Sequence, residues 1–127
     1  MRTRQWLPFA TLSACVLLMV ALITAPSSVE GQDQGQTREF KVVGDHYTFS
    51  PSIIEANRGD VVKITFTAQD IAHSFTIDTP YRISKRAAAG QTVSFEFRVD
   101  APGRHSFYCN LSADPKCKDM KGMLIVR

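Results

Sequence analysis

Residues 61–67, VVKITFT, alternate between two kinds of side chain. The large apolar residues Val62, Ile64 and Phe66 take every second position, and lysine and threonine stand between them. Residues 93–99, VSFEFRV, repeat the pattern with valine and phenylalanine at alternate positions. A period of two residues is typical of a β-strand with one face on the core and the other toward solvent. Both segments are therefore predicted to be strands with one buried face.

Turn-forming residues divide the rest of the domain into short segments. Asparagine, glycine, aspartate and proline gather at residues 57–60, 100–103 and 114–115, and the Arg-Gly-Asp tripeptide at 58–60 is read as such a turn. No helical periodicity continues beyond the N-terminal segment. About seven or eight short strands around a single core predict an all-β fold, most economically a β-sandwich. The expected core includes four phenylalanines: Phe66, Phe95, Phe97 and Phe107.

Length and charge exclude several classes of function. A chain of 127 residues accommodates one small domain. Its formal charge is +3, but Arg2 and Arg4 lie at the extreme N-terminus, and the other basic residues nearly balance the 12 acidic ones. No nucleic-acid surface is expected. No phosphate-binding loop or nucleophile–histidine pair is found either, and we therefore expect a protein that is not an enzyme.

The N-terminus predicts export. Arg2 and Arg4 precede the uncharged, mostly apolar residues 6–25, and a polar run rich in serine, glycine and glutamine follows. A positive start, an apolar centre and small residues at the end are typical of an export signal. The segment 6–25 is also long enough to span a bilayer as an uncleaved anchor. The expected organisation is a signal peptide or membrane anchor at 1–25, a flexible linker at 26–37, and a periplasmic or extracellular domain at 38–127.

Sulfur ligands are concentrated at the C-terminal end of the chain. Residues 107–127, FYCNLSADPKCKDMKGMLIVR, contain Cys109, Cys117 and Met120 but no histidine. Thiolate and thioether sulfur are the ligands that a soft metal such as copper prefers. In an oxidising compartment, Cys109 and Cys117 could instead form a disulfide, which would stabilise a small exported domain.

A copper site of this kind usually also needs an imidazole, and the chain has three histidines. His105 lies four residues before Cys109 on the same expected strand, so their Cα atoms are about 13 Å apart, too far to share a metal. His46 lies in a segment where an exposed histidine is the simpler reading. His73, in QDIAHSFTID, is the one candidate that a separate strand could bring to the Cys109 loop.

Three stretches of the chain resemble the cupredoxin family. Residues 47–78, YTFSPSIIEANRGDVVKITFTAQDIAHSFTID, are similar to the first half of the copper domain in subunit II of haem-copper oxidases. Residues 97–110, FRVDAPGRHSFYCN, resemble the family's strand and turn before the ligand cysteine, and residues 120–126, MKGMLIV, resemble its last strand. The resemblance covers residues 38–127 and implies a Greek-key β-sandwich with copper held at one end.

Carried over to this chain, the resemblance implies that His73 is the first histidine ligand, Cys109 the thiolate and Met120 the axial thioether. The second histidine of the family is missing, since none lies between Cys109 and Met120. Cys117 stands three residues before Met120, where the family often has that histidine, and we infer that a second thiolate replaces it. The predicted metal site is therefore His73, Cys109, Cys117 and Met120, holding one copper ion and softer than the usual set.

Two classes of copper function follow from this site, and a third reading needs no metal. The family resemblance favours electron transfer, which is the function we expect first, and the extra thiolate favours the alternative, binding or delivery of Cu(I). In either case we expect a protein partner that exchanges electrons or copper. The alternative is a metal-free cupredoxin fold, closed by a Cys109–Cys117 disulfide, that serves as an interaction module.

Overall fold

The computed structural model describes residues 35–127. The predicted signal peptide or anchor at 1–25, and all but the last residues of the predicted linker, lie outside the described part. Within residues 35–127, no helix combines the length and the apolar character needed to cross a membrane.

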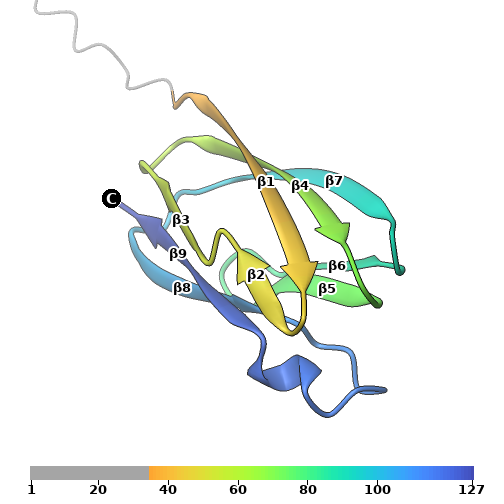
Figure 1. Ribbon diagram of the computed structural model, residues 1–127. Coiled ribbons are helices and arrows are strands. Elements are labelled where there is room, and N and C mark those ends of the chain that lie inside the picture. Colours follow the sequence, from red (N-terminus) through yellow and green to blue (C-terminus); the bar gives the residue numbers. More distant parts are fainter. Residues whose placement is uncertain (1–34) are drawn as a thin grey trace, which may run out of the picture. The chain divides into compact units, whose positions relative to one another are not determined.

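Two β-sheets face each other (Figure 1). One has the strand order β2-β1-β4-β7 and the other the order β3-β9-β8-β5-β6. The described residues thus form nine strands, against the seven or eight predicted, and the all-β sandwich is confirmed. The strands are β1 (Thr37–Asp45), β2 (Thr48–Ser50), β3 (Ile53–Ala56), β4 (Val61–Ala68), β5 (His73–Ile77), β6 (Ile83–Ala87), β7 (Thr92–Arg98), β8 (Gly103–Tyr108) and β9 (Lys121–Val126), with a short 3-10 helix, η1, at Cys117–Asp119.

Consecutive strands repeatedly change sheets, and this wraps the chain around one core. β4 lies between β1, to which it is parallel, and β7, to which it is antiparallel. β9 is likewise parallel to β3 and antiparallel to β8. The alternation along β4 has the predicted sense, since Val62, Ile64 and Phe66 are fully buried and the residues between them are not.

Aromatic side chains fill the space between the sheets. Phe66 and Phe107 are fully buried, as predicted. The prediction was only partly right for Phe95 and Phe97, which pack against the core but keep part of their surface exposed. The reason is the position of β7 at the edge of its sheet, where no further strand covers the outer side of the phenylalanine rings.

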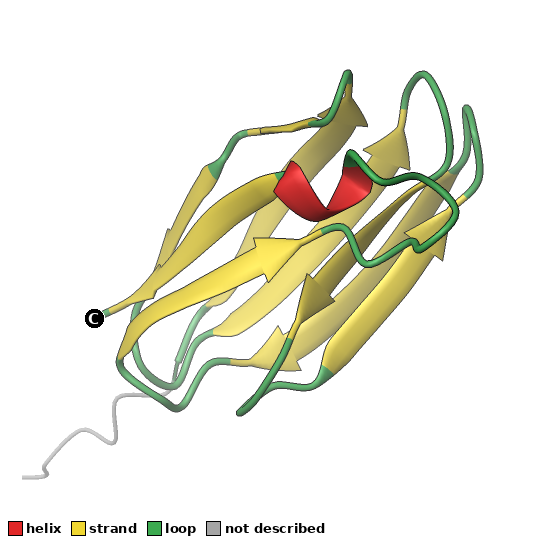
Figure 2. Cartoon of the chain, turned by 90° about the horizontal axis from the view of Figure 1, so that it is seen from below, coloured by secondary structure: helices red, strands yellow, loops and turns green. Residues whose placement is uncertain are grey.

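One end of the sandwich collects the ends of several strands (Figure 2). β1 ends there at Asp45 and β4 ends at Ala68, while β5 begins at His73. The long connection from β8 to β9, which includes η1, closes the same end. Side chains that are far apart in the sequence therefore meet at this end.

A buried aspartate fixes the turn at residues 57–60. Asp60 is 3% exposed and accepts hydrogen bonds from the backbone N–H groups of Asn57 and Gln36, each at 2.9 Å. It also forms an ion pair with Arg38. The Arg-Gly-Asp tripeptide is thus a turn, as expected, with Gly59 at φ 91°. Asp60 joins the first residues of β1 to the start of β4.

We expect the free energy of unfolding to fall less in Asp60→Asn than in the parent as the pH is lowered. Hydrogen bonds from Asn57 and Arg38 hold the pKa of Asp60 below its ordinary value. The folded state therefore binds a proton at Asp60 less readily than the unfolded state does. The ionised carboxylate contributes to stability at neutral pH, and this contribution disappears as pH falls from about 5 toward 2. Urea unfolding at several pH values should show a smaller acid-dependent loss in Asp60→Asn than in the parent. Glu39→Gln, at an exposed carboxylate paired with Lys63, is the matched control, and an equal effect of both changes would contradict the assignment.

Candidate metal centre

The four predicted site residues lie together at the closed end of the sandwich. His73 is the first residue of β5, and Cys109 directly follows β8. Cys117 begins η1, and Met120 directly precedes β9. His73, Cys109 and Met120 are 0% exposed and Cys117 is 1% exposed. The site is therefore built inside the protein rather than on its surface.

A glycine at the end of β1 makes room for this cluster. A methyl carbon added to Gly44 would lie 2.9 Å from the Met120 Cε atom and 3.2 Å from the His73 Cδ2 atom. The first distance is shorter than real carbon contacts, so any side chain at this position would displace Met120. The same atoms show that the thioether and the imidazole both pack against the Gly44 backbone. No signal in the sequence identified this glycine.

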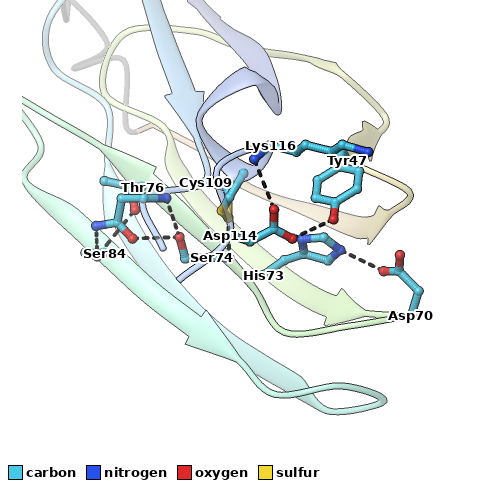
Figure 3. The surroundings of a disulfide bond; sticks show 11 residues. Tyr47, Asp70, His73, Ser74, Thr76, Ser84, Cys109, Asp114 and Lys116 are labelled. Atoms are coloured by element: carbon cyan, nitrogen blue, oxygen red, sulfur yellow. Dashed lines mark hydrogen bonds and ion pairs between the residues drawn. A yellow bond between two sulfur atoms is a disulfide. The ribbon is translucent and has the colours of Figure 1, made fainter. Parts of the chain in front are cut away.

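Cys109 and Cys117 form a disulfide, with their Cα atoms 5.2 Å apart (Figure 3). The two sulfur atoms are therefore joined to each other in this state and do not act as two separate thiolates. The disulfide alternative considered from the sequence is the state that the structure contains. It joins the first residue of the β8–β9 connection to the first residue of η1.

Backbone hydrogen bonds hold the two cysteines in place independently of the disulfide. The Cys109 N–H donates to the carbonyl of Met120 at 3.2 Å, and the Met120 N–H donates to the carbonyl of Cys117 at 3.0 Å. The Cys117 N–H donates to the carbonyl of Asp114 at 3.1 Å. Both half-cystines are thus tied to Met120 through the main chain.

One further N–H group points at a sulfur atom. The Ser74 N–H donates to Cys109 Sγ at 3.4 Å. The Ser74 hydroxyl donates to the Asn110 side chain at 2.7 Å and accepts from the Asn110 N–H at 2.8 Å. These bonds fasten the residue after Cys109 to β5, and they orient Cys109 toward His73's strand.

His73 has one ring nitrogen engaged and one without a partner. Its Nε2 atom lies 2.7 Å from Asp70 Oδ1, whereas the buried Nδ1 atom has no hydrogen-bond partner (Figure 3). Burial alone would raise the pKa of Asp70, but hydrogen bonds from the Ile71 backbone and the His73 ring lower it well below its ordinary value. An ionised Asp70 is an acceptor and keeps the proton on Nε2, which leaves the lone pair of Nδ1 free.

The other two histidines lie outside the cluster, as predicted. His105 Nε2 is 2.8 Å from the carbonyl of Ala101, and its ring packs edge-on against Tyr81. The His46 side chain is 84% exposed and pairs with Asp45. His105 therefore has a structural role, and His46 belongs to the surface.

Tyr47 and Asp114 connect the β1–β2 turn to the β8–β9 connection. The Tyr47 hydroxyl donates to Asp114 at 2.5 Å, and this bond lowers the pKa of Asp114. The Tyr47 ring lies edge-on to His73 at 6.0 Å, and the Lys116 ammonium is 5.6 Å from its centre. We call Tyr47, Asp114 and Lys116 the latch. The latch lies beside His73, and no sequence pattern pointed to Tyr47 or Lys116 in this position.

The donor atoms fit copper once the disulfide is reduced. A buried histidine nitrogen without a partner is unusual, because such groups normally find a hydrogen bond or a ligand. The other ring nitrogen, Nε2, is hydrogen-bonded to the carboxylate of Asp70, and metal-bound histidines commonly have such a partner on the nitrogen that does not bind the metal. Reduction would add two thiolates to this imidazole and to the Met120 thioether, which is a ligand set for a soft ion.

Comparisons with known proteins identify relatives of the fold. A family model described as cupredoxin-like domain matches residues 13–126. No curated protein matches the chain. Among solved structures, a heme-copper terminal oxidase dimer matches with a TM-score of 0.61 and 20% identity, over 71% of this chain and 65% of the oxidase chain.

Two smaller copper proteins also share the fold. Auracyanin A, a blue copper protein from the green thermophilic photosynthetic bacterium Chloroflexus aurantiacus, has a TM-score of 0.62 and 16% identity, over 72% of this chain and 99% of its own. The metal-binding domain of the Cu(I)-exporting P-type ATPase CopA of Streptococcus pneumoniae, with Cu(I), has a TM-score of 0.53 and 19% identity, over 72% of this chain and 86% of its own. At these identities the likeness shows a common fold.

Proposed function

Because this chain belongs to the cupredoxin-like domain family, we propose that it is an exported copper-binding protein. The site holds one copper ion when Cys109 and Cys117 are reduced, with His73 and Met120 completing the ligand set. The observation that carries the proposal is the buried Nδ1 atom of His73, which has no hydrogen-bond partner and lies at the end of the sandwich where Cys109, Cys117 and Met120 are also buried. Copper supplies a soft cation that exchanges one electron between Cu(I) and Cu(II).

Neighbouring residues prepare the ligands for this role. Asp70 holds the proton of His73 on Nε2 and so presents Nδ1 to the site. The N–H of Ser74 favours negative charge on Cys109 Sγ, as a hydrogen bond to a thiolate does. Gly44 leaves the space in which the methyl group of Met120 approaches the imidazole. His73 is 0% exposed, and shielding from water strengthens interactions between charged groups at the site.

Of the two copper roles, the geometry favours binding or delivery of Cu(I). An electron-transfer site needs nearly the same ligands in both states of the metal, so that little rearranges when one electron moves. Here two of the four ligand positions are joined as a disulfide, and that state leaves only the imidazole of His73 and the weakly donating thioether of Met120. Electron transfer, which the family resemblance placed first, stays a prediction.

Export and a protein partner are parts of the same proposal. A disulfide in a small domain suits the periplasm or the extracellular space. A hollow of about 310 Å³ lies beside the site and includes Ile71 and Leu111 among its lining residues. Ile71 is 39% exposed, so a large apolar side chain borders this hollow. We propose that a protein exchanging copper with this chain docks there, and that the chain acts as a binding protein without catalytic turnover.

The direct test is a titration of the full chain with Cu(I) under anaerobic conditions, in competition with a Cu(I) chelator. The reduced chain should take up one Cu(I) and withdraw it from the chelator. The same chain with the Cys109–Cys117 disulfide intact should leave the Cu(I) on the chelator, because the thiolates are absent. Equal uptake by both forms would contradict the thiolate ligands, and no uptake by either form would end the copper proposal.

A further inference from the structure

We propose that the reduced chain converts Cu(II) to Cu(I), with Cys109 and Cys117 as the electron donors and their disulfide as the product. The inference rests on the proposed function, since the same cluster must receive the copper. It adds an activity in which two Cu(II) ions are the substrate.

The first support is that the fold keeps the two thiols close enough to join after reduction. Their Cα atoms are 5.2 Å apart, within the usual range for a disulfide. This spacing is held by main-chain hydrogen bonds from Cys109 to Met120 and from Met120 to Cys117, none of which involves sulfur. The pair can therefore pass between dithiol and disulfide without refolding the connection.

The second support is the donor set beside the pair. His73 Nδ1 is buried without a partner, and Met120 packs against the same Gly44 as the His73 ring. An imidazole binds Cu(II) readily, whereas thioether sulfur favours Cu(I). A Cu(II) ion that enters this cluster thus meets a ligand for its oxidised form together with two thiols that can reduce it.

The third support is the burial of the two sulfur atoms. The N–H of Ser74 donates to Cys109 Sγ at 3.4 Å and so holds this sulfur atom beside β5. Both sulfur atoms are buried, so pairing within the chain is favoured over pairing with another molecule.

The reaction balances with two metal ions per chain. The thiols of Cys109 and Cys117 lose two protons to solvent and two electrons, and one S–S bond forms. Two Cu(II) ions each gain one electron and become Cu(I). His73 and Met120 then remain as neutral donors, so Cu(I) is released to a stronger ligand. One chain performs one cycle until an external thiol reduces the disulfide again.

The test uses the full chain with Cys15→Ser, in which Cys109 and Cys117 are the only thiols. The chain is reduced, freed of reductant without oxygen, and mixed with Cu(II) and a chelator that colours with Cu(I). We expect two Cu(I) per chain, loss of both thiols, and a mass decrease of two hydrogens. The disulfide form and the chain that also carries Cys109→Ser and Cys117→Ser should give no Cu(I) above the protein-free control.

A second variant separates the site from general thiol chemistry. His73→Gln keeps both cysteines but removes the nitrogen that receives Cu(II), and we expect the reaction to slow by about 10-fold or more. An unchanged rate would overturn the inference, because the pair would then react without the site. Stable Cu(II) with both thiols retained would also overturn it, yet leave copper binding intact. Failure of the separate Cu(I) titration would instead remove the proposed function.

Discussion

Replacing Phe66 by alanine is expected to lower the free energy of unfolding by about 3–5 kcal/mol. Phe66 is fully buried on β4, the central strand between β1 and β7. Its ring centre lies 5.9 Å from that of Phe49 and 6.1 Å from that of Phe75, so its loss opens a cavity between the two sheets. Small domains are stable by about 5–15 kcal/mol, and this change therefore removes a large part of the total. Urea unfolding followed by circular dichroism measures it.

Phe97→Ala is the matched control for this prediction. The substitution deletes the same atoms, but Phe97 stands on the edge strand β7 and keeps part of its surface in solvent. Less apolar area is returned to water, and we expect a loss below about 2 kcal/mol. Equal losses for Phe66 and Phe97 would show that the two rings are buried to the same extent in solution, against the structure.

Replacing Cys117 by serine is expected to weaken Cu(I) binding by at least about 100-fold, since groups that only support a metal ligand already cost 10–100-fold when removed. Serine has nearly the same shape, but its hydroxyl is a poor ligand for a soft ion. The measurement is competition with a Cu(I) chelator, using reduced chains that all carry Cys15→Ser. Lys118→Ser, at an exposed position of η1 next to Cys117, is the matched control and should bind as the parent does.

Cys117→His is the complementary change. It restores an imidazole at the position where the cupredoxin pattern often has one, and with Cu(II) it should give strong visible absorption from the Cys109 thiolate. It also removes the disulfide, so the thiol of Cys109 has no partner within the described residues. If Cys117→Ser binds Cu(I) as tightly as its parent, the hypothesis that Cys117 supplies a second thiolate ligand is wrong. The carboxylate of Asp114, which interacts with His73, would then be the group to replace next.

The sequence predicts a strand and its buried face well where apolar and polar residues alternate along that strand. Along β4 every second residue is apolar, and the structure buries those residues. The pattern in β7 is equally regular, yet Phe95 and Phe97 are only partly buried. Periodicity tells which face of a strand turns inward, but it does not tell whether the strand has neighbours on both sides. That is decided by the order of the strands, to which every segment contributes.

The sequence predicts which residues gather at this end of the sandwich, but it does not predict their supporting contacts, and their role as metal ligands stays a prediction. Three histidines and the sulfur residues after position 108 left few combinations, and His73, Cys109, Cys117 and Met120 do lie together. Their surroundings depend on turns from distant parts of the chain. Tyr47, for example, bonds to a residue 67 positions away. Asp70 is easier to predict from the sequence, because it stands three residues before His73 in the stretch that resembles the family.

The disulfide turns the β8–β9 connection into a covalent ring of residues 109–117. A protease that cuts one peptide bond inside this ring, for instance after the exposed Lys116, leaves the last strand bound to the rest of the chain through sulfur. β9 also keeps its main-chain pairing with β8 and β3. Such a nicked molecule migrates as a single band in electrophoresis without reductant, and it separates into two fragments only after reduction. Gel mobility with and without a thiol therefore reports both the state of the pair and the exposure of the loop.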